Sequence, residues 1–170
     1  MTAAPADATP RDVIIDEDAW RQSPFGAETA EAIVYEAVVA VAMELQLGPH
    51  LGFAVLLAND KTLRDLNRVH RGVDRSTNVL SFPAFDPGQL PDAGHIGDIA
   101  IALETVLAES SEAHIRPEHH LAHMVVHGVA HLAGLDHEDD AEAEEMEALE
   151  ARALARLGAP NPHQPTSDEE

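Results

Sequence analysis

Three histidines in the second half of the 170-residue chain are spaced like the ligands of a single metal ion. They follow the pattern His127-x-x-x-His131-x-x-Gly134-x-x-His137. A helix advances about 100° per residue, so histidines four positions apart lie on one helical face and can bind the same ion. Gly134 permits the sharp turn that would bring His137 to that face. The pattern predicts a three-imidazole site with one position open for water, whose pKa a bound ion can lower to about 7.

Two other interpretations of these histidines stay open. They could be ordinary packed or solvated side chains. They could also hold a structural zinc ion, although structural sites usually have four protein ligands, often including Cys. The sequence contains no Cys, so a metal site in this chain must be built from His, Asp or Glu.

His123 and Asp136 lie next to the predicted ligands in the sequence. His123 falls within about 40° of His127 on the same helical face. It could replace a ligand or close the site, but we expect it to support the ligands or to pack, because His137 follows the glycine that would deliver it. Asp136 could orient a ligand imidazole, as carboxylates near metal sites often do, or it could cap a helix end.

The spacing of the three histidines equals that of the metzincin proteases, in which a Glu follows the first His. Gly128 stands at that position in this chain. Peptide hydrolysis uses that carboxylate to activate water and to shuttle its proton. Protease activity is therefore disfavoured.

Four arginines form a second group that could do chemistry. Arg64, Arg68, Arg71 and Arg75 are spaced four, three and four residues apart, which is one helical face if a helix extends that far. A guanidinium can hold a phosphate with two hydrogen bonds, which a Lys cannot do. The alternative is a solvated face whose arginines pair with acidic neighbours, and this alternative is strongest for Arg64 and Arg75.

The overall charge limits the partners that the chain can bind. With 10 basic and 31 acidic residues, the formal net charge is −21, which argues against general binding of nucleic acids, DNA included. The distribution is uneven, because half of the basic residues lie between Lys61 and Arg75. The average charge therefore hides a local basic patch.

The elements that must position these residues can be predicted from apolar spacing and helix-end signals. We expect strands at 13–15, 51–58, 78–82 and 99–103, and helices at 27–45, 60–72, 117–134 and 139–157. Asp60 is the expected N-cap of the second helix, and the Pro- and Gly-rich segment 83–94 is an expected loop. Ile99 and Ile101 alternate with alanines, which predicts a half-buried strand.

Strands interleaved with helices and followed by further helices indicate an α+β fold. We predict a single-domain layered fold, with a small mixed sheet packed by helices and the metal site on a helix of the C-terminal half and the turn after it. The domain spans 11–157, between a flexible N-terminal arm at 1–10 and a flexible tail at 158–170. Asn78 and Ser81, on the third predicted strand, could contact a substrate or simply close that strand.

Two features predict a cytoplasmic protein that does not enter a membrane. The first residues lack the basic and then apolar layout of a signal peptide. The longest apolar stretch, at 32–43, is too short to span a bilayer and contains Glu36.

The segment 123–150, HMVVHGVAHLAGLDHEDDAEAEEMEALE, strongly resembles the signature of the YbeY family of bacterial metal-dependent endoribonucleases, also called rRNA maturation factors. Two further blocks match in the expected order, NRVHRGVDRSTNVLSFP at 67–83 and GDI at 97–99. Together the resemblance covers about residues 55–157. Ala130 replaces a common Leu and Leu135 a common aromatic residue, both at packing positions.

This resemblance implies a small α+β fold that holds one metal ion per chain at His127, His131 and His137. The ion is usually taken as zinc, although another divalent metal can take its place. Arg71 matches the family's essential arginine. The implied function is cleavage of single-stranded ribosomal RNA, in maturation of the 3′ end of the small-subunit rRNA and in ribosome quality control, with the ribosome or ribosomal proteins as partners.

Two other functions stay open beside this one. The chain could be a metallohydrolase of another substrate such as a peptide, or a non-catalytic ribosome-associated factor that the metal stabilises. For an RNA substrate, screening over about 8 Å at physiological salt should let the ion and the arginines outweigh distant acidic residues. We expect weak binding to naked RNA, with a ribosomal partner supplying the orientation.

Overall fold

The computed structural model describes residues 12–15, 20, 23–86 and 88–164. The strands form one mixed sheet in the order β1-β2-β4-β3. In this sheet β1 (Asp12–Ile15), β2 (Leu51–Ala58) and β4 (Gly94–Ala102) run parallel, and β3 (Val79–Pro83) lies antiparallel to β4 at one edge.

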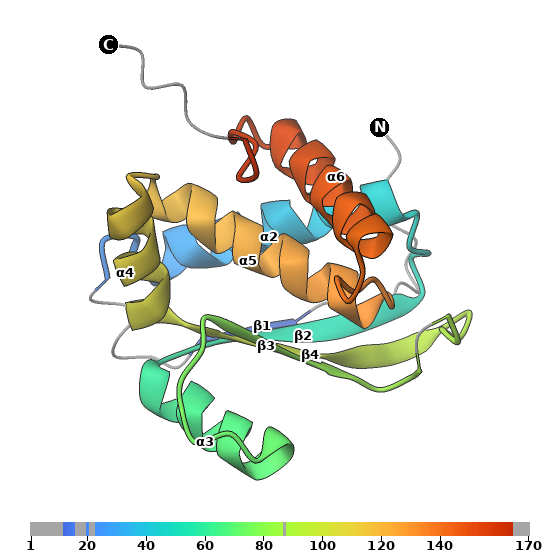
Figure 1. Ribbon diagram of the computed structural model, residues 1–170, viewed down its shortest axis with the longest axis horizontal. Helices are drawn as coiled ribbons and strands as arrows, with labels where there is room; N and C mark the ends of the chain where they lie inside the picture. The colour runs from blue at the N-terminus through green and yellow to red at the C-terminus, as the bar shows by residue number, and fades with distance from the viewer. Residues whose placement is uncertain (1–11, 16–19, 21–22, 87, 165–170) are drawn as a thin grey trace.

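The helices cover the two faces of this sheet unequally (Figure 1). On one face lie α2 (Gly26–Leu45), α4 (Leu103–Ala113) and α5 (Pro117–Leu132), with α6 (Asp140–Arg156) packed on α2 and α5. The opposite face is covered by α3 (Asp60–Arg71). The predicted α+β fold, with a small mixed sheet packed by helices, is confirmed.

The side chains of β2 alternate between two cores. Phe53, Val55 and Leu57 enter the main core that the sheet forms with α2 and α5. Leu56 and Ala58 belong to a smaller cluster between the sheet and α3. The strand is therefore apolar on both faces, as its continuous hydrophobic run requires.

The prediction of a half-buried strand at 99–103 is wrong. Ala100 and Ala102 are 2% and 0% exposed, because α3 covers the face that they occupy. The strand also begins at Gly94, earlier than predicted, and pairs there with Leu51 of β2. Leu103 lies beyond its end and is the first residue of α4.

Helix α4 was not predicted from the sequence, because neither of its ends carries a residue that is typical of helix ends. Its N-cap, Ala102, has no side chain that could accept a hydrogen bond from the first turn. Its C-cap, His114, adopts the left-handed conformation (φ 56°) in which glycine is the common residue. Leu103 also continues the apolar alternation of the preceding strand, which concealed the boundary.

The N-cap of α3 is Asn59, not the predicted Asp60. The Asn59 side chain accepts a hydrogen bond from the Thr62 amide at 2.8 Å, whereas the Asp60 carboxylate accepts one from the Thr105 hydroxyl of α4 at 2.7 Å. Asp60 is thus the first residue of the helix and links α3 to α4. The predicted end of this helix is confirmed, because Gly72 adopts a left-handed conformation (φ 69°).

Two glycines let α5 and β3 approach β4 closely. A Cβ atom at Gly97 would lie 2.6 Å from the carbonyl oxygen of Phe82 and 2.6 Å from the Leu132 side chain, and its φ is +150°. A Cβ atom at Gly128 would lie 2.9 Å from the Ile99 side chain. These contacts bring the histidine-bearing helix against the strands that carry the other candidate residues.

Part of the predicted C-terminal tail packs on the domain. Ala159 is buried, and His163 hydrogen-bonds to Glu150 of α6 at 2.7 Å. The predicted N-terminal arm at 1–10 and the last six residues of the tail, 165–170, lie outside the described residues. Among the helices that the structure describes, none combines the length and apolar character needed to cross a bilayer.

Replacement of Gly97 by Ala should lower the free energy of unfolding by at least about 2 kcal/mol, because the new methyl group meets a backbone carbonyl at a left-handed position. Gly48→Ala is the matched control, since a Cβ atom there has open space, and it should change the free energy by less than about 0.5 kcal/mol. Urea unfolding of both variants measures the difference. Equal stability of the two variants would contradict the packing described for β3 and β4.

Candidate metal centre

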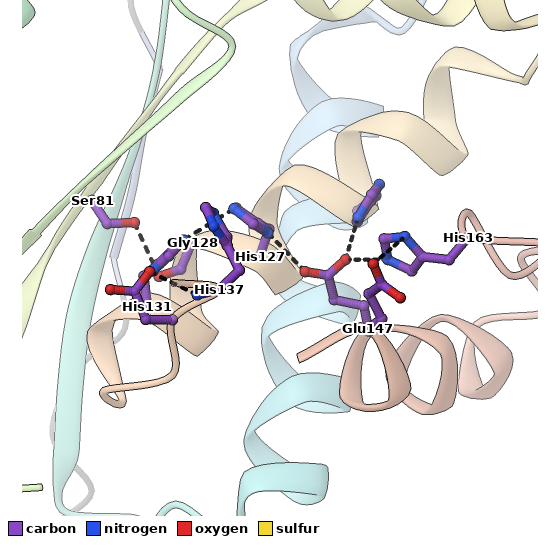
Figure 2. Close-up of polar contacts among 10 residues, drawn as sticks. Ser81, His127, Gly128, His131, His137, Glu147 and His163 are labelled. Atoms are coloured by element: carbon purple, nitrogen blue, oxygen red, sulfur yellow. Dashed lines mark hydrogen bonds and ion pairs between the residues drawn. The ribbon is translucent and has the colours of Figure 1, made fainter. Parts of the chain in front are cut away.

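The structure brings His127, His131 and His137 together. One ring nitrogen from each of the three lies within 4.8 Å of the others. The Nε2 atoms of His127 and His131 are 3.1 Å apart, and the His137 ring centroid lies 5.9 Å and 5.4 Å from those of His127 and His131. Figure 2 shows the three side chains gathered on α5 and the turn that follows it. Three imidazole nitrogens at this separation are a donor set that could hold one metal ion.

The local backbone explains why His137 joins two residues of a helix. The helix ends at Leu132, and Gly134 turns the chain with a φ of +98°. The amide of Leu135 donates to the Ala130 carbonyl at 3.0 Å, which closes the turn. The Asp136 carboxylate then accepts a hydrogen bond from the amide of His137 at 2.8 Å. This contact matches neither role predicted for Asp136, because it is a bond to the next backbone amide in the turn, between the end of α5 and the N-cap of α6 at Asp139.

The protonation of His131 favours metal binding. Burial lowers the pKa of His131, and the nearby rings of His127 and His137 lower it further, against an opposing effect of Asp136. The ring is therefore neutral at neutral pH, and a neutral imidazole is the form that binds a metal.

Glu150 of α6 contacts the predicted site and was not among the predicted site residues. Its side chain is 2% exposed, and its Oε2 atom lies 2.7 Å from Nδ1 of His127. Burial alone would raise the pKa of Glu150, but hydrogen bonds from His123 and His127 hold it well below its usual range. An ionised carboxylate only accepts hydrogen bonds, so the proton of His127 lies on Nδ1 and its Nε2 lone pair faces the other two rings.

A sequence signal for Glu150 does exist. It lies four residues after Met146 and four before Leu154, both of which are buried on the same face of α6. An acidic residue inside such an apolar stripe needs a buried partner, which points to a polar cluster on the neighbouring helix.

The three histidines line a cleft of about 440 Å³ together with Arg71 and the residues of β3. A guanidinium nitrogen of Arg71 donates to the Ser81 carbonyl at 2.7 Å, and its central carbon lies 6.0 Å from the centre of the Phe82 ring. A guanidinium has five N–H groups, so this anchoring bond leaves others for a ligand in the cleft.

The other three arginines are placed differently. Arg75 lies after the end of α3, because Gly72 ends the helix first, so the condition for one helical face of four arginines is not met. Arg64 forms an exposed ion pair with Asp74 at 2.8 Å. This confirms for Arg64 the alternative of a solvated arginine that pairs with an acidic neighbour. Arg68 lies 3.5 Å from Asp65, three residues before it on the same helix. Among these four arginines, Arg71 is the one that lines the cleft.

Asn78 and Ser81 line the cleft, but their side chains are engaged in bonds that hold the walls together. The Ser81 hydroxyl donates to the carbonyl of Gly128 at 3.1 Å and joins β3 to α5 (Figure 2). The Asn78 amide donates to Glu109 of α4 at 3.0 Å. Glu109 also lies 2.9 Å from Nε2 of His120.

Gly128, which stands where the metzincin proteases have a Glu, packs closely against the sheet. A side chain at residue 128 would point at Ile99 of β4, on the sheet side of α5, and not at the three imidazoles. Any side chain introduced there would first have to displace Ile99. The close packing of α5 on β4 thus favours glycine over Glu at this position.

Comparisons with known proteins identify the family of the chain. A sequence model of the family described as Endoribonuclease YbeY matches residues 16–158. A protein of that name from Bradyrhizobium sp. (strain BTAi1) is 44% identical over 169 residues, with 96% of each chain covered. Another, from Rhodopseudomonas palustris (strain BisB18), is 46% identical over 156 residues, covering 89% of this chain and 90% of that protein.

A solved structure supports the fold. The solution structure of a Thermotoga maritima protein covers 91% of this chain and 98% of its own, with a TM-score of 0.55 and 22% sequence identity. On the extent of the family match and of these identities, the chain belongs to the YbeY family of endoribonucleases.

Proposed function

We propose that this protein is a metal-dependent endoribonuclease that cleaves single-stranded ribosomal RNA, with a zinc ion held by His127, His131 and His137. The observation that carries the proposal is the convergence of three imidazole nitrogens in the same cleft as the Arg71 guanidinium. A cation beside an arginine is a combination suited to a phosphodiester, which carries negative charge on its oxygens.

The donor set fits zinc. Imidazole nitrogen is a good zinc ligand, and three protein ligands are the usual number where an ion takes part in a reaction. The same nitrogens also suit nickel, copper and iron, so another divalent ion can compete for the site. When bound, such an ion supplies a Lewis acid that polarises a phosphate oxygen.

The protein's own residues orient the reacting groups. Glu150 fixes the His127 ring through Nδ1, and Asp136 fixes the turn that presents His137. Arg71, anchored on the Ser81 carbonyl, directs its remaining N–H groups toward charge that develops on the phosphoryl oxygens. Whether the attacking oxygen belongs to water or to the RNA 2′-hydroxyl, these residues hold the same phosphate group.

The charge of the protein shapes how RNA reaches the cleft. With a net charge of −21, long-range attraction to RNA is absent, and the favourable charge is confined to the ion and Arg71. We infer that the ribosome or a ribosomal protein orients the substrate, in the cytoplasm, where the 3′ end of the small-subunit rRNA is matured. Relatives named Endoribonuclease YbeY support the RNA substrate class.

Replacement of His131 by Ala should remove one zinc ion per chain and reduce cleavage of a single-stranded RNA oligonucleotide by at least about 100-fold, because two imidazoles do not hold the ion. Zinc content by mass spectrometry and cleavage are measured on the same sample. His119→Ala, which removes another α5 histidine outside the cluster, is the control and should change neither value. Full activity of His131→Ala would refute the proposal, and unfolding on chelation without any metal-dependent cleavage would favour a non-catalytic ribosomal factor.

Replacement of Arg71 by Ala should leave the zinc content unchanged and lower the cleavage rate by about 100-fold or more, because the guanidinium touches the substrate and not the ion. Arg71→Lys should recover little, since an ammonium cannot make the two parallel bonds of a guanidinium. The matched control is Arg68→Ala, an exposed arginine of the same helix outside the cleft. Loss of zinc or of folding in Arg71→Ala would assign this residue a structural role instead.

A further inference from the structure

A second cluster of side chains that could bind a metal ion lies next to the first. It consists of His123 on α5, Glu150 on α6 and His163 in the segment after α6, and one potential ligand atom from each lies within 4.8 Å of the others. Glu150 Oε1 lies 2.6 Å from Nε2 of His123 and 2.7 Å from Nε2 of His163. Three separate parts of the chain thus direct two imidazole nitrogens at one carboxylate oxygen.

The two clusters share no ligand atom. In the first cluster His127 offers Nε2, while its Nδ1 atom contacts Glu150 Oε2. The second cluster uses the other oxygen, Oε1, so Glu150 could bind an ion there and still hold His127. Both clusters can therefore be filled at the same time, connected through one carboxylate and one imidazole ring.

The surroundings of the second cluster suit an ion. A cavity of about 230 Å³ reaches His123, Glu150 and His163, and it leaves room for solvent as a fourth ligand. The Glu147 carboxylate lies 3.9 Å from Nδ1 of His163, so a ring that binds through Nε2 can turn its Nδ1–H toward this acceptor (Figure 2). The Glu150 side chain is 2% exposed, so this carboxylate is a ligand that is already held in place inside the protein.

The potential ligand atoms of the second cluster would need to move only a little to surround a zinc ion. Ligand atoms around a tetrahedral zinc ion lie roughly 3.4 Å apart, given bonds of about 2.1 Å, so the rings would move by less than about 1 Å from their present hydrogen-bonding distances. The side chain of His163 is 28% exposed and belongs to a segment outside the helices, so it can make this movement.

We propose that His123, Glu150 and His163 form a second metal site that takes a zinc-class ion, with nitrogen and carboxylate ligands, beside the three-histidine centre. Two imidazoles and one carboxylate select zinc, cobalt or nickel over Mg²⁺ and Ca²⁺, which prefer oxygen ligands. The inference goes beyond the proposed nuclease function, because this ion does not contact the cleft that holds Arg71. It fastens the C-terminal segment to α5 and α6 and fixes the carboxylate that orients His127.

The test is a count of ions per chain. Wild type, His163→Gln, His131→Ala and the double variant are stripped with chelator, equilibrated by dialysis at one fixed free Zn²⁺ concentration and analysed by mass spectrometry. We expect two zinc ions in wild type, one in each single variant and none in the double variant. Gln at residue 163 keeps a hydrogen-bond donor for Glu150, so we expect the variant to fold. Its amide is a poor zinc ligand, so the second site should be lost.

Two controls define the site. His119→Ala should keep two zinc ions, which excludes loose binding by surface histidines, and dialysis against Mg²⁺ should leave the second site without an ion. Co²⁺ absorption of His131→Ala, which reports the nitrogen ligands of the second site alone, should vanish when His163→Gln is added. One zinc ion in wild type, or two in His163→Gln, would overturn the inference. Because His131→Ala abolishes the first site only, failure of the nuclease proposal and failure of the second site give different results.

Discussion

The candidate centre depends on a carboxylate that is buried among imidazoles. Glu150 projects from α6 onto α5, and its two oxygens contact His123, His127 and His163. Removing a hydrogen-bond partner from a buried carboxylate costs about 1.5–3 kcal/mol, so the position of α6 on α5 is tied to the orientation of these rings. The chemistry of the cleft and the docking of the last helix are thus consequences of the same interaction.

The opposite wall of the cleft depends on close packing and not on charge. Gly128 lets α5 press on Ile99, and the Ser81 hydroxyl bonds to the Gly128 carbonyl at the same place. The carbonyl of Ser81 in turn receives Arg71 from α3, on the other face of the sheet. Residues from both sides of the sheet therefore meet at the short edge strand β3, and the cleft lies along that strand.

This layout determines how a strongly acidic protein can bind RNA. The positive groups of the cleft are few, and most other arginines described here pair with acidic neighbours, as Arg64 does with Asp74 and Arg152 with Glu44. A protein of this charge gains little affinity for RNA from its surface as a whole. Selectivity must then arise at the cleft and from whatever larger assembly presents the RNA.

Much of the centre could be predicted from the sequence, because its strongest signals are local. The interval from His127 to His131 places two rings on one helical face, and Gly134 supplies a turn whose φ requires glycine. The α+β class followed from local patterns of the same kind. Apolar spacing distinguishes strands from helices, and residues typical of helix ends mark the boundaries between them. Where such residues were missing, as at Ala102 and His114, α4 was not predicted.

Only the tertiary structure decided which distant residues support those local patterns. Glu150 and His163 are 23 and 36 positions after His127, and nothing in their own neighbourhoods fixes which ring they contact. The burial of Ala100 and Ala102 likewise depends on α3 crossing the second face of the sheet. Helical spacing is set by backbone geometry within a few residues, whereas partners across the core are set by how whole helices dock, which is the sum of many contacts.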